Sequence, residues 1–310
     1  MAEESRSSPM TPGVDSAPFD NLASKASNLF VIWWAFRKNK LALAAGILLA
    51  VIILGALTAP LLATHNPIKI DLSPRLQKLP PSGAHWLGTD DMGRDLWSRI
   101  LYGSRVSLIV AFLTSFFSVI MGASYGALSG YHGGRLDMAL MRFVDIMLSL
   151  PTMFLLIIFA TFVRLNAIGI ALVISFTSWM SIARIVRGEF LRYKEFEFVE
   201  AARAMGFSSA RIIFRHIMPN VTAPVIVNAT LMVAYSILTE STLSFLGLGV
   251  QPPQFSWGSM LTNAQDLVLL QDAPWVAIFP GIAIFITVLS FNFFGDGLRD
   301  ALDPKLKNIK

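Results

Sequence analysis

The segment Glu200–Gly206, with the sequence EAARAMG, lies in the most basic hydrophilic gap between two long apolar runs of this chain. Alanine, glutamate, arginine and methionine are good helix formers, and a glycine such as Gly206 commonly follows the end of a helix. Ser208 or Ser209 can cap a second helix, and Pro219 marks the entry into the next apolar run. The stretch therefore predicts a polar helix–turn–helix over residues 195–217 that joins two membrane spans.

The apolar runs around this segment indicate the fold class. Of the 310 residues, 54% are hydrophobic and 15% are charged, whereas soluble domains carry about 25% charged residues. Six runs reach the length that crosses a bilayer, and backbone groups in hydrocarbon must satisfy one another within helices. The sequence predicts an all-α membrane protein with six transmembrane helices, at Leu41–Ala63, Val106–Ala127, Met138–Phe162, Ala167–Ile185, Val221–Leu246 and Trp275–Phe294.

The distribution of basic residues predicts the orientation of these helices. Residues 184–215 contain seven Lys or Arg, whereas residues 247–274 contain none. Because Lys and Arg collect in short cytoplasmic loops, both termini and the loop 186–220 are expected in the cytoplasm. The loops 65–104 and 247–274 are then external, although the first of them also carries five basic residues.

The N-terminal part divides into two segments. Residues 1–28 are rich in Ser, Pro and Ala and predict a disordered cytoplasmic tail. Residues 29–40 are apolar, include Trp33 and Trp34, and end in basic residues, which predicts a helix at the membrane interface. Residues 41–310 then form one six-helix transmembrane domain, in which Pro151 is expected to kink the third span.

Several functions are disfavoured by what the sequence lacks. It has no cysteine, which excludes disulfides and thiolate metal sites. Its four histidines are far apart in the sequence, and the acidic residues near His85 lack EF-hand spacing, so no metal site is predicted. There is no GxxxxGK[ST] phosphate loop for ATP, and no constellation of catalytic side chains at mid-membrane depth. The net charge of +5 is attributed to cytoplasmic loops rather than to nucleic-acid binding.

The segment Glu200-Ala201-Ala202, with Gly206 and Pro219, resembles the coupling-loop motif of bacterial ABC importer permeases. The match departs at His216, where the general motif has isoleucine, and at Met218, which replaces the leucine before the proline. Three other segments resemble the peptide and nickel importer permeases of this class. They are His85–Asp90 with Gly93–Asp95, Leu243–Gly249 with Gln251–Pro253 and Trp257–Gly258, and Gly295–Pro304.

The resemblance implies the ABC importer permease fold and a role as the second, C-type permease subunit of a dipeptide or oligopeptide system in the bacterial cytoplasmic (inner) membrane. Such a subunit is not an enzyme. Its partners are a second permease, two ATPase subunits that bind ATP and Mg²⁺, and an extracytoplasmic substrate-binding protein, all working at a lipid bilayer. The chain itself is expected to hold no cofactor and no metal.

The resemblance also assigns residues to two docking surfaces. Contact with the ATPase is expected at Glu200, Ala201, Ala202, Met205, Gly206, Ser208 and Pro219, where the small alanines permit close approach. Docking of the binding protein is expected at Asp90, Asp91, Arg94, Asp95, Gln251 and Trp257. The amphipathic segment Arg94–Tyr102 is expected to lie on the outer membrane surface beside this second dock.

Polar residues within the spans are the candidates for a translocation pathway. They include Glu240, Asn228, Tyr235 and Trp179. Glu240 either takes part in structural pairing or contacts substrate. Near the end of the third span, Arg142 and Asp145 are spaced for a local i,i+3 ion pair, with a contact to another helix as the alternative.

Two alternatives to a peptide importer remain at this point. The same machinery can carry nickel chelates, oligosaccharides or another small solute. A more remote alternative is a secondary transporter that works alone, although such proteins usually have inverted repeats and mid-depth charges, which this sequence does not clearly show.

Overall fold

The computed structural model describes residues 32–162 and 166–302; the segments 1–28 and 303–310 lie outside this description. Within the described residues every named element is a helix, apart from an isolated bridge between Thr89 and Asp95. Residues 32–38, inside the predicted interfacial helix, are helical. The elements are α2 (Lys40–Leu57), α3 (Ala59–Leu62), α4 (Leu96–His132), α5 (Gly134–Ser149), α6 (Thr152–Phe162), α7 (Ala167–Tyr193), α8 (Glu197–Ala204), α9 (Ser209–Arg211), η1 (Ile212–Ile217), α10 (Met218–Phe245), α11 (Trp257–Leu261), η2 (Thr262–Gln265), α12 (Leu267–Asp272) and α13 (Trp275–Leu302).

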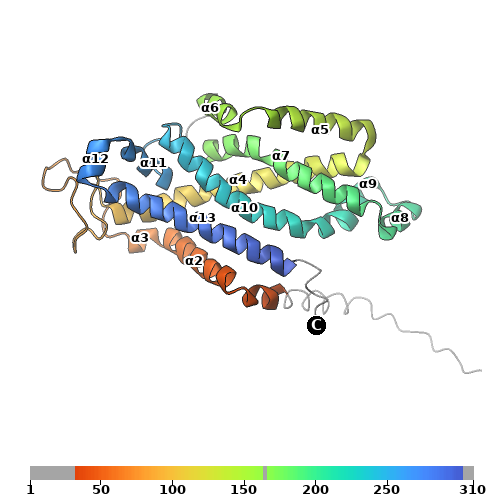
Figure 1. The fold of residues 1–310 in the computed structure, drawn as a ribbon, viewed down its shortest axis with the longest axis horizontal. Helices are drawn as coiled ribbons and strands as arrows, with labels where there is room; N and C mark the ends of the chain where they lie inside the picture. Colours follow the sequence, from red (N-terminus) through yellow and green to blue (C-terminus); the bar gives the residue numbers. More distant parts are fainter. Residues whose placement is uncertain (1–31, 163–165, 303–310) are drawn as a thin grey trace, which may run out of the picture.

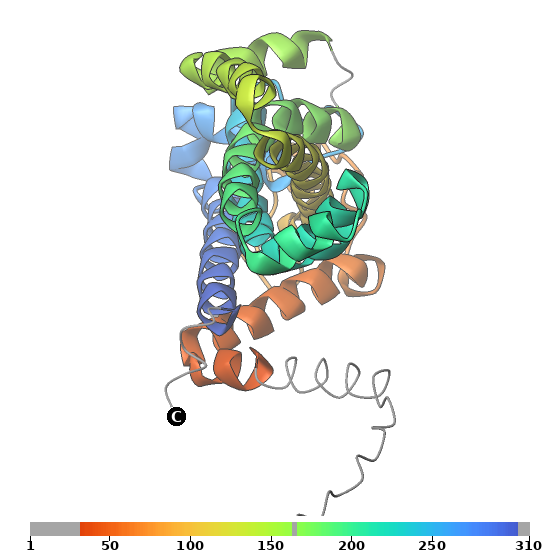
Figure 2. The same ribbon diagram turned by 90° about the vertical axis from the view of Figure 1, so that its right-hand side faces the viewer.

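The long helices α2, α4, α7, α10 and α13 run along the longest axis of the molecule (Figure 1). Seen from the end, α2 lies on one side of the central helices and the pair α5 and α6 lies on the opposite side (Figure 2). Helices α8 and α9 are at one end of the bundle, whereas α11 and α12 are at the other (Figure 1). The segments predicted to lie on opposite membrane faces are therefore at opposite ends of the fold.

Five of the predicted spans correspond to helices long and apolar enough to cross a membrane. These are α2, α4, α7, α13 and the nearly continuous stretch Ser209–Phe245, which joins α9, η1 and α10. The third predicted span, Met138–Phe162, is two helices, α5 and α6, that meet at an angle of 91°. The count of six therefore depends on whether this bent pair crosses the membrane as one span.

The bend between α5 and α6 follows from Pro151, as the sequence predicted. Proline has no backbone N–H for the helical ladder, and its ring disfavours the helical conformation in the residue before it. Leu150 is accordingly extended, with φ −81° and ψ 140°, and α6 begins at Thr152. The kink is a complete interruption of the helix rather than a gentle bend.

Helix α4 packs along α7 through three glycines spaced four residues apart, Gly122, Gly126 and Gly130. If Gly122 carried a Cβ atom, it would lie 2.6 Å from the carbonyl oxygen of Trp179, and a Cβ atom added at Gly130 would lie 2.6 Å from Cβ of Phe190. Small residues at this spacing let two membrane helices approach closely, so that dispersion contacts hold them together. The sequence analysis did not identify this stripe.

Glycines also bring α13 close to its neighbours. Gly297 contacts Ala42 of α2, and Gly295 packs against Leu231 of α10, with 2.9 Å between its added Cβ and Leu231 Cδ2. The tail motif beginning at Gly295 is thus part of α13 and packs two helices onto it. Its charged residues Asp296, Arg299 and Asp300 are exposed, as expected of a solvated helix end.

Two ion pairs join α5 to α7. Asp137 accepts hydrogen bonds from Nε and a terminal nitrogen of Arg187 at 2.5 and 2.6 Å, and Ser129 of α4 donates to the same carboxylate. Asp145 lies 2.5 Å from Arg184. The expected local pair of Asp145 with Arg142 is therefore wrong, because the carboxylate faces α7 and forms the alternative contact to another helix.

Two predictions at the start of α4 are also wrong: where the preceding loop ends, and the surface position of Arg94–Tyr102. The loop expected over 65–104 ends at Asp95, because Asp95 caps the N-terminus of α4 and the helix begins at Leu96. The segment Arg94–Tyr102 is not a separate surface helix, since its residues Leu96, Ser98, Arg99 and Leu101 are buried in the fold. Leu96 and Leu101 are buried within the chain, whereas Trp97 is half-buried and packs against the exposed Trp86.

Candidate functional site

The helix–turn–helix predicted from EAARAMG is present at the α8 and α9 end of the bundle. α8 covers Glu197–Ala204, and Gly206 follows it with φ +77°, a backbone conformation that favours glycine. The Phe207 N–H donates to the Ala202 carbonyl, which closes the end of the helix. The Ser208 side chain then accepts a hydrogen bond from the Arg211 N–H and caps α9. The first helix, the turn at Gly206 and the cap at Ser208 are confirmed, whereas the second helix continues without a break through η1 into α10.

The alanines of α8 do not share one environment. Ala202 is 0% exposed and packs with Val199, Ile212 and Ile217 in an apolar cluster under the helix. Ala201 is exposed, as is Ala204. The prediction that the small residues together face a partner is therefore corrected for Ala202: it lets α8 sit close to η1, while its neighbours remain available for contact.

The outer side of the helix–turn–helix carries large apolar side chains. Met205 is 65% exposed and Phe214 is 70% exposed, and Phe196 and Phe198 are each 40% exposed. We call these four residues the apolar coupling surface. The sequence analysis missed the three phenylalanines, although aromatic residues at exposed positions of a short charged helix are a signal for contact with another protein.

The remaining predicted coupling residues all lie at the surface. Glu200, Gly206, Ser208 and Pro219 are exposed. The Arg203 guanidinium lies 5.6 Å from the ring centroid of Tyr131. The seven predicted positions therefore divide into one buried spacer, Ala202, and six exposed residues around the apolar coupling surface.

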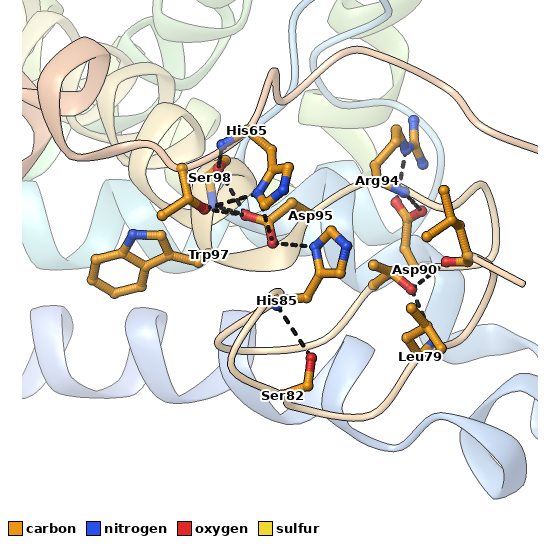
Figure 3. Close-up of polar contacts among 12 residues, drawn as sticks. His65, Leu79, Ser82, His85, Asp90, Arg94, Asp95, Trp97 and Ser98 are labelled. Atoms are coloured by element: carbon orange, nitrogen blue, oxygen red, sulfur yellow. Dashed lines mark hydrogen bonds and ion pairs between the residues drawn. The ribbon is translucent and has the colours of Figure 1, made fainter.

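At the opposite end, the loop between α3 and α4 is organised by two buried carboxylates (Figure 3). Asp90 accepts hydrogen bonds from Arg94 Nε at 2.7 Å and from the Arg94 N–H at 2.9 Å. One oxygen of Asp95 accepts from the N–H and the hydroxyl of Ser98, and the other lies 2.9 Å from His85 Nδ1. These bonds fold residues 85–98 into a compact polar turn.

Burial raises the pKa of Asp95, but the hydrogen bonds from the Ser98 N–H and hydroxyl, the bond from His85 and the charge of His65 lower the pKa more. The net pKa of Asp95 is therefore below its ordinary value. Its carboxylate stays ionised at neutral pH and can hold the cap of α4 and a neighbouring positive charge together.

Half of the residues predicted to dock a binding protein are buried. Asp90, Asp95 and Trp257 are each at most 2% exposed, and Trp257 Nε1 donates to the Ile100 carbonyl at 3.0 Å. These three residues are packed inside the α11 and α12 end of the fold, and their side chains are not open to a partner. Asp91 is half-buried and accepts a hydrogen bond from Asn263 of η2 at 3.0 Å.

Arg94 and Gln251, the other two predicted docking residues, retain access to solvent. They line a cleft of about 710 Å³ together with Asn263 and the residues from Gly249 to Phe255. This cleft lies between the α3–α4 loop and the segment that leads into α11. An incoming ligand or protein segment can reach this cleft.

Glu240 is fully buried and joins α10 to α11. One of its carboxylate oxygens accepts hydrogen bonds from Ser244 and Ser256, each at 2.6 Å. The backbone of Gly258 packs against the same carboxylate, 3.2 Å from an added Cβ. The other carboxylate oxygen has no hydrogen-bond partner among the described residues. The two hydroxyl bonds favour the structural pairing that the sequence left open, with hydroxyl groups as partners instead of a base.

The other pathway candidates differ in accessibility. Trp179 is 5% exposed and packs edge-on against Tyr125. Asn228 donates to the carbonyl of Pro224 within α10. Tyr235 is 45% exposed and is the most exposed of the four pathway candidates. The four residues do not gather at one site within the chain.

Replacing Ser256 with alanine is expected to lower the thermal stability of the purified chain, because the buried Glu240 carboxylate loses one of its two hydrogen bonds and α11 loses its N-terminal cap. Such a loss costs about 1–3 kcal/mol. Thermal unfolding in detergent measures it, with Thr242→Ala as the control, since Thr242 bonds only within α10 at an exposed position. An unchanged melting temperature combined with altered substrate preference would assign Glu240 to the pathway instead.

Comparison with known proteins places these features in a family. Residues 122–308 match the family described as binding-protein-dependent transport system inner membrane component, and residues 27–81 match the N-terminal TM domain of oligopeptide transport permease C. The first match includes α7 to α13 and the helix–turn–helix. The second includes α2 and the start of the α3–α4 loop.

Relatives extend the similarity over nearly the whole chain. The dipeptide transport system permease protein DppC of Alkalihalophilus pseudofirmus is 41% identical over 299 residues, covering 96% of this chain and 97% of the relative. The oligopeptide transport system permease protein OppC of Haemophilus influenzae is 44% identical over 270 residues, covering 87% and 86%.

A solved structure supports the fold. The MetNI methionine ABC transporter in an inward-facing conformation contains a chain that matches with a TM-score of 0.52 and 21% identity, covering 66% of this chain and 96% of that chain. The shared helical arrangement, the α8–α9 helix–turn–helix and the two sequence matches agree with one another. This chain therefore belongs to the family of binding-protein-dependent transport permeases, within the branch that contains the dipeptide and oligopeptide C-type permeases.

Proposed function

We propose that this chain is the C-type permease subunit of an ATP-driven importer for dipeptides or oligopeptides. The relatives with 41% and 44% identity are a dipeptide and an oligopeptide permease, and their alignments cover most of both chains. The chain forms half of the translocation pathway and has no catalytic role of its own. Substrate is delivered by a binding protein, and a second permease forms the other half of the pathway.

The apolar coupling surface is the observation that carries the mechanism. Met205 and Phe214 are large, apolar and exposed at the end of the bundle, while Ala202 and Val199 anchor the helix beneath them. Lipid covers the exposed apolar side chains of the long helices, but α8 also carries Glu197, Glu200 and Arg203, and this mixture of charged and apolar groups favours a protein partner. We assign this surface to the ATPase subunits, which bind ATP and Mg²⁺ and transmit their closure through α8 to the long helices as a rigid-body movement.

The orientation follows from the same assignment. With α8 and α9 in the cytoplasm, the α3–α4 loop and the α11–α12 segment face outward, where Arg94 and Gln251 line the open cleft. The binding protein docks over this cleft. Six crossings of the bacterial cytoplasmic membrane, with α5 and α6 together as one of them, place both termini in the cytoplasm.

Replacing Met205 with aspartate is expected to abolish peptide-stimulated ATP hydrolysis in the complex reconstituted with the second permease, the ATPases and the binding protein. A charge at this exposed apolar position disfavours burial against a partner, while Met205 contacts little within the chain. Met205→Leu is the matched control, because it keeps an apolar side chain and is expected to retain most of the activity.

Two measurements separate the possible outcomes of this test. Thermal unfolding of the isolated chain should be the same for Met205→Asp and the wild type, and co-purification of the ATPase should decrease for the aspartate variant alone. Peptide-stimulated hydrolysis by Met205→Asp at the wild-type rate would refute the coupling surface. Peptide uptake by the chain alone in liposomes, without nucleotide, would refute the importer itself.

A further inference from the structure

Two histidines and an aspartate from three places in the sequence meet in the loop between α3 and α4. His65 follows α3, His85 lies in the polar turn, and Asp95 caps α4 (Figure 3). The candidate ligand atoms of the three side chains all lie within 4.8 Å of one another. The two imidazole rings face each other with 4.5 Å between their centroids and a tilt of 30°.

We propose that His65, His85 and Asp95 bind a divalent transition-metal ion of the Zn²⁺ type, with water in the fourth position. Two imidazole nitrogens and one carboxylate oxygen form a ligand set that suits Zn²⁺. This site departs from the expectation of no metal, which weighed His85 with the nearby aspartates and considered the histidines too far apart in sequence.

The distances around Asp95 match the edges of a tetrahedral site. One carboxylate oxygen of Asp95 lies 2.9 Å from His85 Nδ1 and 3.7 Å from His65 Nδ1. Ligands about 2.0–2.2 Å from Zn²⁺ at tetrahedral angles are separated by about 3.4 Å. The two measured separations bracket this value, and the third edge, between the two histidine nitrogens, is at most 4.8 Å. Movement of the exposed His65 ring toward His85 would close this edge around an ion.

The carboxylate of Asp95 divides its oxygens between two tasks. One oxygen accepts from the Ser98 N–H at 2.9 Å and from the Ser98 hydroxyl at 2.7 Å, which fixes the side chain at the start of α4. The other oxygen faces both histidines. Outer hydrogen bonds of this kind orient metal ligands, and here they leave one anionic oxygen free to bind the ion.

His65 is held in place by the same serine and keeps access to solvent. Its backbone N–H donates to the Ser98 hydroxyl at 3.1 Å, and its Nδ1 lies 3.0 Å from the Thr64 hydroxyl. The His65 side chain is 43% exposed, whereas the side chains of His85 and Asp95 are 12% and 1% exposed. An ion can therefore enter from the His65 side and retain a water molecule there.

A hydrogen-bonded Asp–His pair without an ion explains only part of this geometry. It accounts for His85, which lies at hydrogen-bonding distance from Asp95. The Nδ1 atom of His65 is 3.7 Å from the same oxygen, beyond hydrogen-bonding distance, and lies at hydrogen-bonding distance from the Thr64 hydroxyl instead. Without an ion, two separate contacts hold the two rings; a bound metal would join both rings to Asp95 and would tie the end of α3, the polar turn and α4 together.

The test is equilibrium dialysis of the full-length, tag-free chain in detergent against Zn²⁺, followed by measurement of zinc by atomic emission. We expect one ion per wild-type chain and at least tenfold weaker binding in His65→Ala and His85→Ala. Ser98→Ala removes the hydroxyl that bonds to the Asp95 carboxylate and is expected to weaken binding about 10–100-fold. His132→Ala is the matched control, since His132 bonds to Leu128 within α4, outside the cluster.

Asp95→Asn separates loss of the ion from loss of the fold. Asparagine caps helices as well as aspartate does, so this variant is expected to remain folded without Zn²⁺ while losing the anionic ligand. Zn²⁺ should raise the melting temperature of the wild type and of His132→Ala, and leave that of Asp95→Asn unchanged. A wild-type chain without stoichiometric zinc, or binding unaffected by the His65 and His85 substitutions, would overturn the proposal.

Discussion

Replacing Gly126 with leucine is expected to remove most of the folded protein. A Cβ atom at this position meets the carbonyl of Ala183 and lies 2.9 Å from Cβ of Val186, so the backbone of α7 must move to make room. Overpacking costs about 1–3 kcal/mol and more where the backbone shifts. Against a total stability of about 5–15 kcal/mol, an overpacking cost of about 1–3 kcal/mol lowers the melting temperature, and the larger cost of shifting the backbone of α7 is what unfolds most of the chain.

Gly188→Leu is the control for Gly126→Leu. Gly188 is also helical, on α7, but no atom lies within 4 Å of an added Cβ, so the same side chain extends into open space. Fluorescence-detected size exclusion of detergent extracts measures the folded amount, and thermal unfolding measures the stability of what remains. If Gly126→Leu had the melting temperature of the wild type, the close contact between α4 and α7 at Gly126 would be contradicted.

Replacing Ala202 with glutamate is expected to detach α8 from the bundle and to stop coupling. Ala202 is 0% exposed among Val199, Ile212 and Ile217, and the glutamate brings a charge into this apolar cluster. Burying a charge without a partner costs several kcal/mol, which exceeds what a short helix gains from packing. Helix α8 therefore loses its packing against η1, and the apolar coupling surface is displaced with it.

Ala204→Glu is the matched variant for this second prediction, because Ala204 is exposed on the same short helix. Limited proteolysis of the isolated chain should cleave residues 195–217 faster in Ala202→Glu than in Ala204→Glu or the wild type. In the assembled transporter, Ala202→Glu should lack peptide-stimulated ATP hydrolysis. Equal proteolysis of the two variants would contradict the buried position of Ala202 and the packing role assigned to it.

The sequence predicted the helices well where one local rule was sufficient. Long apolar runs gave the positions of α2, α7, α10 and α13, because a span needs a fixed length of apolar residues. Glycine and serine preferences gave the end of α8 and the cap of α9. Pro151 gave the break in the third span, although its 91° angle depends on how α5 packs against α4 and α7.

The functional positions were harder to predict, because burial depends on neighbours that are distant in sequence. Asp90, Asp95 and Trp257 read as exposed docking residues, yet Arg94, Ser98 and Ile100 enclose their polar groups. Ala202 read as a contact residue, yet it lies beneath its own helix. In each case the residue type marked an important position, but it did not predict whether the side chain faces the interior or the surface.

The sequence by itself determined the class, the long helices, the helix–turn–helix and the resemblance to importer permeases, since these depend on composition and on spacing within one segment. The tertiary structure alone decided which side chains meet. It placed Asp145 against Arg184 and sealed Glu240 between Ser244 and Ser256. It also brought His65 to His85 and Asp95, because the end of α3 and the start of α4 fold onto the same serine. Contacts of this kind arise from chain reversal and helix packing, and the sequence pattern of a single segment cannot predict them.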